Sequence, residues 1–257
     1  MFFNKKYRIL KKMHYVADQQ GIIKRFLKES ENWGSHLEHC KAAIKKDLSG
    51  RGRGKCAVLG SGWLLDIPID ALLEHFEKVY LFDIIHPTQV KHKYAHNPKV
   101  VFVELDITGS VITQMFEAVQ YYKSTKYVKN IDTYQFEGFQ YPEEFDFVIS
   151  ANIISQLATL LVEYITPYGL YSDEELALLS RKVEESHLQS LPVGKTFLIT
   201  DYEELVYSKD NILEKQRPLL QVSFNSLPVA ESWQWKFDRD DYYKDKNVVY
   251  NVIALQK

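Results

Sequence analysis

The sequence predicts an α/β protein: a mostly parallel sheet with helices on both faces, a C-terminal antiparallel hairpin and an N-terminal helical extension. Short apolar runs alternate with longer amphipathic stretches over most of the chain, which is typical of a parallel sheet that is covered on both sides. The last two strand-like runs are separated only by the charged residues 238–246. These two runs therefore predict a hairpin that closes the sheet with at least one antiparallel strand.

The start of the chain has a helical pattern. An apolar stripe at the spacing of one helix face is formed by Leu37, Cys40, Ala43 and Ile44. The glycine-rich, basic residues 49–55 then interrupt this pattern. We therefore divide the chain into a helical extension, residues 1–50, and an α/β domain, residues 51–257.

Seven runs of apolar character predict the strands. Those before the hairpin are short and continuously apolar, and several of them end in a small or acidic residue. The seven runs are residues 55–60, 78–83, 99–106, 145–151, 194–201, 231–237 and 247–255. Amphipathic stretches lie between them, the clearest being residues 68–77 and 109–124, and we expect these to form helices on the faces of the sheet.

Length and composition fit a globular protein. The chain has 257 residues, of which 46% are hydrophobic and 26% charged, enough for a full core. No stretch of 18 uncharged apolar residues is present, and the basic N-terminus lacks an apolar signal region, so we expect neither a transmembrane segment nor a signal peptide. Cys40 and Cys56 have no CxxC spacing, which favours a reducing, cytoplasmic location.

The charge is distributed unevenly along the chain. Residues 1–55 hold 14 Lys and Arg against 5 Asp and Glu, although the net charge of the whole chain is only −2. Such a basic arm fits an acidic partner, for example nucleic acid, an anionic membrane or an acidic substrate. The alternative is a pair of helices whose charges face water or the acidic remainder of the chain. The oligomeric state is left open.

The residues that follow each predicted strand are the candidates for a site. In an open parallel sheet, ligands bind beyond the carboxyl ends of the strands, where the strand order changes direction. Asp83 follows Gly60 by 23 positions, which is about where an acid reaches the hydroxyls of a ribose. The strand ends in chain order carry Gly60-Ser61-Gly62-Trp63, Asp83, Asp106, Ser150-Ala151-Asn152 and Asp201.

This layout resembles the class I S-adenosylmethionine-dependent methyltransferases, in particular poorly characterised bacterial members, over residues 50–257. The resemblance implies a Rossmann-like, seven-stranded sheet, S-adenosylmethionine as cofactor and transfer of its methyl group to an unidentified acceptor. It also implies cofactor-binding roles for the residues at the strand ends. These are Gly60, Ser61, Gly62 and Trp63 for the methionine moiety, Asp83 with Ile84 for the ribose, Asp106 with Ile107 for the adenine, and Asn152 beside the methyl group.

Methyl transfer demands little from side chains, because the sulfonium is already activated. The enzyme has to align the acceptor, exclude water and, for poor nucleophiles, remove a proton. Our catalytic candidates at the strand ends are therefore few. They are Asn152 for orientation, Asp201 as a base or for orientation of the acceptor, and Tyr202.

The sequence also departs from the family pattern. The family loop has the form acid-x-Gly-x-Gly-x-Gly, whereas this chain has Val58 in place of the acid and Leu64 in place of the third glycine. Asp66 is a candidate replacement for the missing acid. A catalytically idle binding or regulatory protein on the same scaffold is therefore an alternative. A dinucleotide-binding enzyme is a further one, although Leu65 stands where its fingerprint requires glycine.

Each candidate also has a purely structural interpretation. The glycines can form a plain strand-to-helix turn, and an aspartate at a strand end commonly caps the next turn. His36, His39 and Cys40 share one face of a predicted helix, which is a spacing compatible with zinc. No fourth ligand with motif spacing accompanies them, so we expect no metal site and assign these side chains to the packing stripe and its edge.

Overall fold

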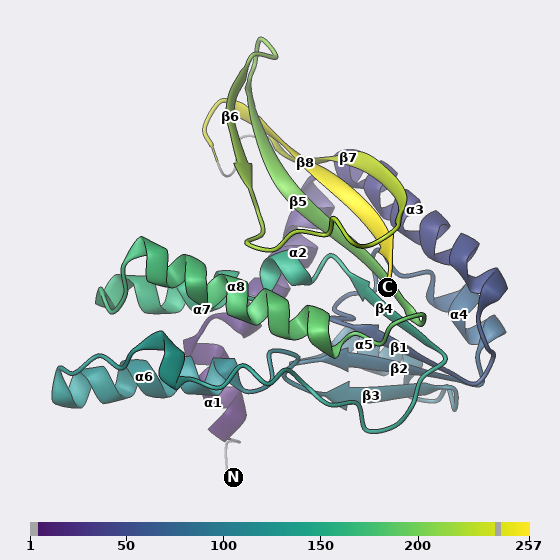
Figure 1. Cartoon of the computed structure of the whole chain (residues 1–257). Coiled ribbons are helices and arrows are strands. Elements are labelled where there is room, and N and C mark those ends of the chain that lie inside the picture. The colour runs from purple at the N-terminus through teal and green to yellow at the C-terminus, as the bar shows by residue number, and fades with distance from the viewer. Residues whose placement is uncertain (1–4, 240–242) are drawn as a thin grey trace.

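A computed structural model of the chain describes residues 5–239 and 243–257. Its centre is one eight-stranded sheet with the order β3-β2-β1-β4-β5-β8-β7, and β6 pairs with β5 beside this path (Figure 1). The strands are β1 (Lys55–Leu59), β2 (Lys78–Asp83), β3 (Val100–Glu104), β4 (Phe147–Ala151), β5 (Thr196–Ser208), β6 (Leu213–Pro218), β7 (Val229–Arg239) and β8 (Lys246–Gln256).

The sheet is parallel from β3 to β5 and antiparallel beyond it. β1 pairs in parallel with β2 on one side and with β4 on the other, so the strand order changes direction at β1. β8 pairs antiparallel with both β5 and β7. The predicted C-terminal hairpin is confirmed, although residues 240–242 of its turn lie outside the described residues.

The expectation of seven strands was wrong, because the sheet has an eighth strand, β6. Its sequence, LEKQRP, has no apolar run, and all six residues are exposed. Such a strand buries neither face, so hydrophobic periodicity gives no signal for it. It forms because β5 is 13 residues long and continues past the parallel sheet, where β6 and β8 pair with its second half. Together with β7 these strands form a wing at the top of Figure 1.

Eight α-helices are described. α8 begins at a complete capping box, in which Ser172 and Glu175 satisfy each other's backbone N–H groups. The helices are α1 (Lys5–Lys12), α2 (Tyr15–Lys28), α3 (Ser30–Asp47), α4 (Ile69–His75), α5 (Thr88–Tyr94), α6 (Val111–Thr125), α7 (Thr159–Ile165) and α8 (Asp173–Ser190).

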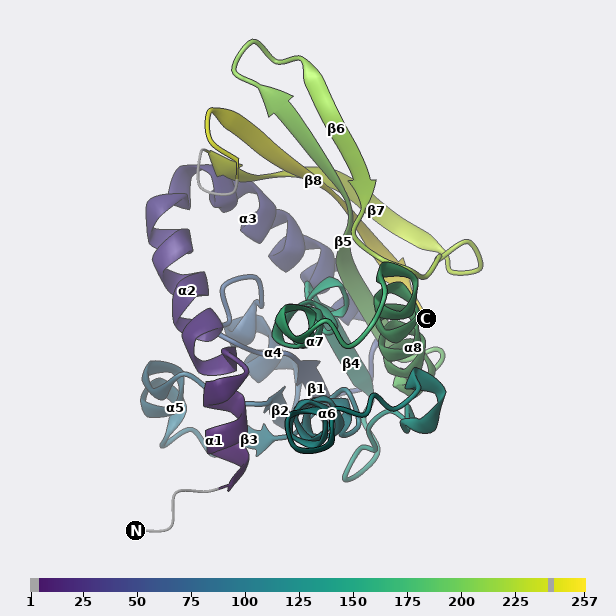
Figure 2. The same cartoon turned by 90° about the vertical axis from the view of Figure 1, so that its left-hand side faces the viewer.

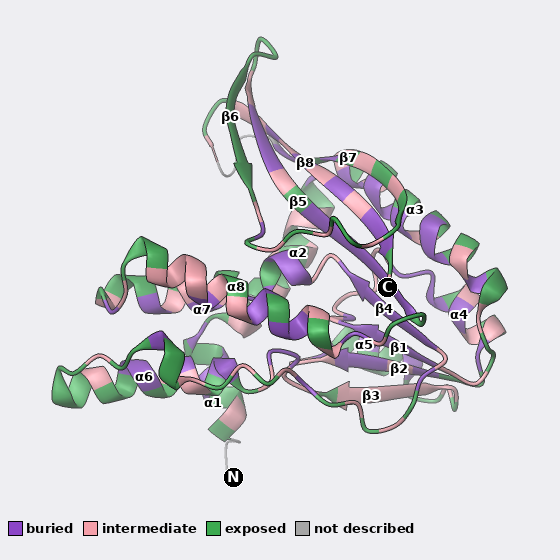
Figure 3. Cartoon of the chain, in the orientation of Figure 1, coloured by how far each residue is buried: buried purple, intermediate pink, exposed green. Residues whose placement is uncertain are grey.

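The sheet separates two hydrophobic cores. Along β1, Cys56 and Val58 point into the core shared with α3 and α4, whereas Ala57 and Leu59 point into the core shared with α1, α6 and α8. This alternation is the two-residue period of a strand that is covered on both faces. Figure 3 accordingly shows the central strands β1 and β4 buried, between helices whose outer faces are exposed.

The N-terminal helices pack against the rest of the chain. α1, α2 and α3 follow one another along one side of the molecule in Figure 2, past the ends of the parallel strands. α3 buries the predicted stripe together with Trp33 and His36. Both of these rings stack on or against the ring of Trp235 in β7. The helices expected in residues 1–50 are therefore part of the same core as the sheet, and the division of the chain at residue 50 stays a prediction.

Candidate functional site

The loop after β1 keeps a left-handed backbone at three alternating positions. Gly60, Gly62 and Leu64 have φ angles of 66°, 46° and 58°. A Cβ on Gly60 would lie 2.7 Å from Cγ1 of Ile153, so only glycine fits there. Leu64 occupies the place of the third glycine, and its backbone adopts the conformation that a glycine would favour. The shape of a three-glycine loop is thus present although one glycine is missing.

Asp83 joins this loop to the end of β2. The backbone N–H of Gly62 donates to Oδ2 of Asp83 at 2.7 Å, and the N–H of Ile85 donates to Oδ1 at 3.2 Å. Burial raises the pKa of Asp83 to about 6, against the lowering effect of these backbone donors. The spacing of Gly60 and Asp83 suggested a ribose site. The hydrogen bond from Gly62 brings Asp83 directly against the loop that contains Gly60.

Asp106 closes a turn after β3. Its Oδ1 accepts a hydrogen bond from the N–H of Thr108 at 2.9 Å and another from the Thr108 hydroxyl at 2.6 Å. Burial raises the pKa of Asp106, and the Thr108 bonds oppose this shift. The turn-capping interpretation of Asp106 is therefore confirmed as one of its roles. Ile107 is buried in the core with α6 and α8.

A cavity of about 340 Å³ lies beside Asp106, within the size range of small-molecule sites. Ile84 and Leu105 line it from the strand ends, so the residue after Asp83 and the one before Asp106 meet there. α1 forms another wall. The remaining lining residues are Lys6, Ile9 and Leu10 of α1, Gly109, Ser110, Ile112 and Thr113 around the start of α6, and Phe139 and Gln140.

Several buried polar atoms at this edge of the sheet have no hydrogen-bond partner among the described residues, and three of them lie around the candidate site. They are the hydroxyl oxygens of Ser61 and Tyr15 and the amide oxygen Oδ1 of Asn152. The Tyr15 pKa is raised, mainly by burial and next by the charge of Asp106. Buried polar atoms nearly always have a partner. These exceptions, two after strand ends and one in α2, fit a site that is completed by a polar ligand.

Trp63 fastens α2 to the loop. Its indole N–H donates to the backbone oxygen of Gln19 at 2.7 Å, and the Gln19 side-chain amide donates to the backbone oxygen of Ile85. α2 is therefore tied to the ends of both β1 and β2. Sequence reasoning missed Gln19 and Tyr15, because more than 40 positions separate them from the strand ends that they contact and no motif marks them.

Asn152 also has a left-handed backbone, with φ 51°, a conformation that asparagine tolerates better than most residues. Its Nδ2 donates to Oδ2 of Asp66 at 2.7 Å. Asp66 therefore lies at the end of β4, beside the amide of Asn152. Burial raises the pKa of Asp66, and the bond from Asn152 opposes this.

The two remaining catalytic candidates lie in different environments. Asp201 is 1% exposed and accepts a hydrogen bond from the Ser155 hydroxyl at 2.6 Å. Burial raises the pKa of Asp201 to about 6. Tyr202, in contrast, is 37% exposed. The expectation that the fifth strand ends at Asp201 was wrong, because β5 pairs with β8 and continues to Ser208. Asp201 is therefore buried within the strand, and Tyr202 lies at the surface.

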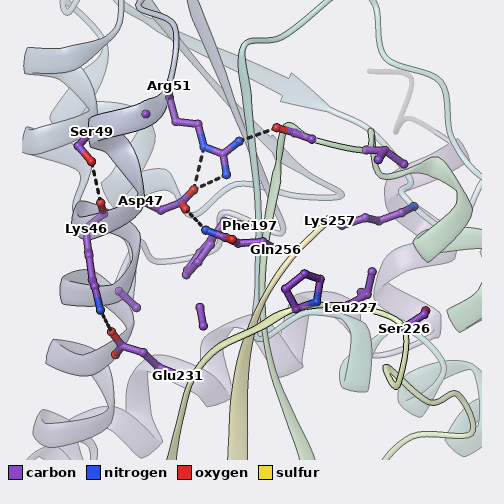
Figure 4. A pocket seen from close by; sticks show the side chains of 16 residues that line it. Lys46, Asp47, Ser49, Arg51, Phe197, Ser226, Leu227, Glu231, Gln256 and Lys257 are labelled. Atoms are coloured by element: carbon purple, nitrogen blue, oxygen red, sulfur yellow. Dashed lines mark hydrogen bonds and ion pairs between the residues drawn. The ribbon is translucent and has the colours of Figure 1, made fainter.

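A larger hollow than the cavity beside Asp106 lies elsewhere. A groove of about 800 Å³ runs between the end of α3 and the beginning of β5 (Figure 4), at the amino end of the parallel strands. Four of its charged side chains form two pairs with one another, whereas Lys257 donates to the backbone oxygens of Leu188 and Leu191. Arg51 bonds to Asp47, and Lys46 lies 2.9 Å from Glu231. The strand-end residues do not line this groove, so its size alone does not make it the candidate site.

Two kinds of feature are absent from the described part of the chain. Within residues 5–239 and 243–257, no helix is both long enough and apolar enough to span a membrane. In the same residues, no three His, Cys, Asp or Glu side chains are grouped so that they could hold a metal ion.

No protein-family model and no curated protein matches the chain. Solved structures do match it, and several of them are methyltransferases. The N-methyltransferase NodS from Bradyrhizobium japonicum, in complex with S-adenosyl-L-homocysteine, is 11% identical, with 86% of this chain and 87% of that chain covered and a TM-score of 0.40.

Two further matches cover more of this chain. The 1,6-didemethyltoxoflavin-N1-methyltransferase from Burkholderia thailandensis, with 1,6-didemethyltoxoflavin and S-adenosylhomocysteine bound, is 10% identical. The match covers 95% of this chain and 89% of that one, with a TM-score of 0.44. A S-adenosylmethionine-dependent methyltransferase from Leishmania major is 14% identical, with 96% and 82% covered and a TM-score of 0.42.

Proposed function

We propose that this protein binds S-adenosylmethionine at the carboxyl ends of β1 to β4 and transfers the methyl group to an acceptor. The observation that carries the proposal is the link between the loop and Asp83. A left-handed Gly60–Gly62 turn and a buried carboxylate at the next strand end share one hydrogen bond, and no ion pair to this carboxylate is present among the described residues.

The donor set at this edge fits the cofactor. Asp83 would accept hydrogen bonds from the ribose hydroxyls, and the cavity beside Ile84 and Asp106 would take the adenine. The loop backbone and the unpaired hydroxyl of Ser61 would hold the methionine end. When bound, S-adenosylmethionine supplies an activated methyl group on a sulfonium, so the protein needs no nucleophile of its own.

The residues of this chain would then supply position and proton transfer. Asn152 orients the acceptor at the end of β4, and its unpaired Oδ1 accepts a hydrogen from it. Asp201 has a pKa of about 6, so it is mostly ionised at neutral pH and can accept a proton from a weak nucleophile. Tyr202 has no catalytic role in this proposal, because its side chain is exposed.

Two other functions compete with this proposal. A catalytically idle protein on the same scaffold would bind the cofactor without turnover. A dinucleotide-binding enzyme would bind NAD instead, but Leu65 fills the position at which its fingerprint needs glycine.

Calorimetric titration separates these functions. We expect saturable heat with S-adenosylmethionine and S-adenosylhomocysteine and none with NAD. Heat with NAD alone would favour the dinucleotide enzyme. Binding without methyl transfer to any compound in a broad acceptor panel would favour the idle scaffold.

A cytoplasmic location remains part of the proposal, since Cys40 and Cys56 are both free and buried and thus fit a reducing compartment.

A further inference from the structure

Five side chains form a polar cluster between α3 and the ends of β1 and β4, with one contribution from β7. We name this set, His36, Cys40, Asp66, Asn152 and Trp233, the α3 cluster. The proposed function uses only Asn152. His36 and Cys40 are 1% and 0% exposed, and buried polar groups of this kind require an account of every hydrogen bond.

Trp233 determines which ring nitrogen of His36 carries the hydrogen. The Trp233 indole N–H donates to Nδ1 of His36 at 3.1 Å, and an indole nitrogen can only donate. Burial lowers the pKa of His36 to about 3, so the ring is neutral at physiological pH and carries one hydrogen. Because Nδ1 accepts, this hydrogen lies on Nε2. The ring also stacks on Trp235 with 3.9 Å between centroids, which holds its plane.

Cys40 receives the next two hydrogens. Nε2 of His36 and Nδ2 of Asn152 are 3.3 Å apart, but both carry hydrogen and therefore do not bond to each other. Each nitrogen lies 3.6 Å from Sγ of Cys40, within range of a weak sulfur acceptor. The cysteine sulfur is thus the common acceptor for the histidine and the amide.

Asp66 determines which way the Asn152 amide is turned. Nδ2 donates to the Asp66 carboxylate at 2.7 Å. If the amide were reversed, Oδ1 of Asn152 would lie 2.7 Å from the Asp66 carboxylate oxygen. The two oxygens would repel each other, and the hydrogen bond from Nδ2 would be lost. The nitrogen is therefore held inward by Cys40 and Asp66. The oxygen Oδ1 is left on the other side, buried and without a partner among the described residues.

We propose that His36, Cys40 and Asp66 are positioning residues, which hold the Asn152 amide so that Oδ1 is offered to a hydrogen-bond donor on the methyl acceptor. The role given to Oδ1 rests on the proposed function, whereas the orientation of the amide does not. An acceptor that presents an N–H or O–H at its nucleophilic atom fits this oxygen. A thioether or a bare carbon nucleophile does not.

Nuclear magnetic resonance of the full-length, ¹⁵N-labelled protein tests the orientation without cofactor. We expect the ring nitrogens of His36 to show the neutral form with hydrogen on Nε2, and Trp233→Phe to abolish this preference. In Cys40→Val, which replaces the thiol by a somewhat larger apolar side chain and removes the acceptor, hydrogen exchange of the Asn152 amide should become at least about fivefold faster, the equivalent of one hydrogen bond.

The matched control is Cys56→Val. Cys56 is a second fully buried thiol. Its sulfur donates to the backbone oxygen of Ala57 and has no hydrogen bond to the α3 cluster among the described residues, so the Asn152 signal should not change. Hydrogen on Nδ1 of His36, or equal exchange in Cys40→Val and the wild type, would overturn the orientation. If the wild type binds neither S-adenosylmethionine nor S-adenosylhomocysteine, the role of Oδ1 falls together with the proposed function, and the orientation of the amide is still measured.

Discussion

At the scale of single residues, Leu64 is the clearest departure from the expected loop, and its backbone leads to a prediction. A side chain at φ 58° costs about 1 to 2 kcal/mol relative to glycine. Alanine is usually more stable than glycine by about 0.4 to 1 kcal/mol. Here we expect the reverse order: Leu64→Gly should be more stable than Leu64→Ala by about 1 kcal/mol in urea unfolding. Greater stability of Leu64→Ala would contradict the left-handed geometry.

Asp83 predicts how cofactor affinity depends on pH. Ribose hydroxyls donate to the carboxylate, so binding favours its ionised form. Because burial raises the pKa of Asp83 to about 6, affinity should fall as the pH drops through 6, by up to about tenfold per pH unit. Calorimetry from pH 5 to 8 with S-adenosylhomocysteine measures this. Asp83→Asn should bind more weakly at neutral pH, and its affinity should not depend on pH in this range. An equal slope of affinity against pH in both proteins would refute the role of the Asp83 carboxylate.

Some site residues can be predicted from the sequence and others cannot. Asp83, Asp106 and Asn152 are predictable because strand ends meet at one edge of a parallel sheet. The contact between Asp66 and Asn152 joins residues 86 positions apart, and no periodicity encodes it. The loop pattern marks Asp66 as a replacement acid, but only the fold shows that it contacts an amide at β4.

At the scale of elements, α2 should depend on Trp63. Trp63→Phe keeps most of the ring but loses the bond to Gln19, which should cost about 0.5 to 1.5 kcal/mol. Hydrogen exchange should therefore accelerate in α2 more than in the sheet. Trp235→Phe is the control, because the indole nitrogen of Trp235 has no partner among the described residues and its loss should leave α2 unchanged. Similar exchange of α2 in both variants would show that Trp63 does not fasten it.

The elements differ in how well the sequence predicts them. The seven apolar runs correspond to seven strands because the apolar side chains of each strand pack against a hydrophobic core; those of β3 are only partly buried. β6 has no buried face, and its pairing depends on the unusual length of β5. The N-terminal helices are predictable from their periodicity, but their course along the strand ends results from tertiary contacts such as that of His36 with Trp235.

At the scale of the whole molecule, Glu184 makes stability depend on pH. This residue of α8 accepts the N–H groups of Gln221 and Val222 at 2.7 and 3.2 Å, so it joins a helix to the chain between β6 and β7. Burial raises the pKa of Glu184 to about 7. A raised pKa stabilises the fold below the unfolded value near 4.5, and this stabilisation is lost as the pH rises through 7.

Replacing Glu184 should remove this decrease in the free energy of unfolding at rising pH. Relative to Glu184→Gln, the wild type should lose up to roughly 3 kcal/mol between about pH 4.5 and 8, measured as the free energy of unfolding in urea. Glu185→Gln alters the neighbouring, exposed carboxylate and should keep most of the wild-type pH dependence, because burial contributes more to the raised pKa of Glu184 than the charge of Glu185 does. A constant difference between Glu184→Gln and the wild type would mean that Glu184 does not titrate in this range.

The central claim is that the carboxyl edge of β1 and β2 binds S-adenosylmethionine through Asp83. The most direct measurement is the dissociation constant of S-adenosylhomocysteine for the wild type and for Asp83→Ala at about pH 7.5, with melting temperatures to confirm that both are folded. Loss of charged hydrogen bonds costs about 1.5 to 3 kcal/mol, so affinity should fall roughly tenfold to over a hundredfold. No binding by the wild type, or equal constants in two folded proteins, would contradict the claim.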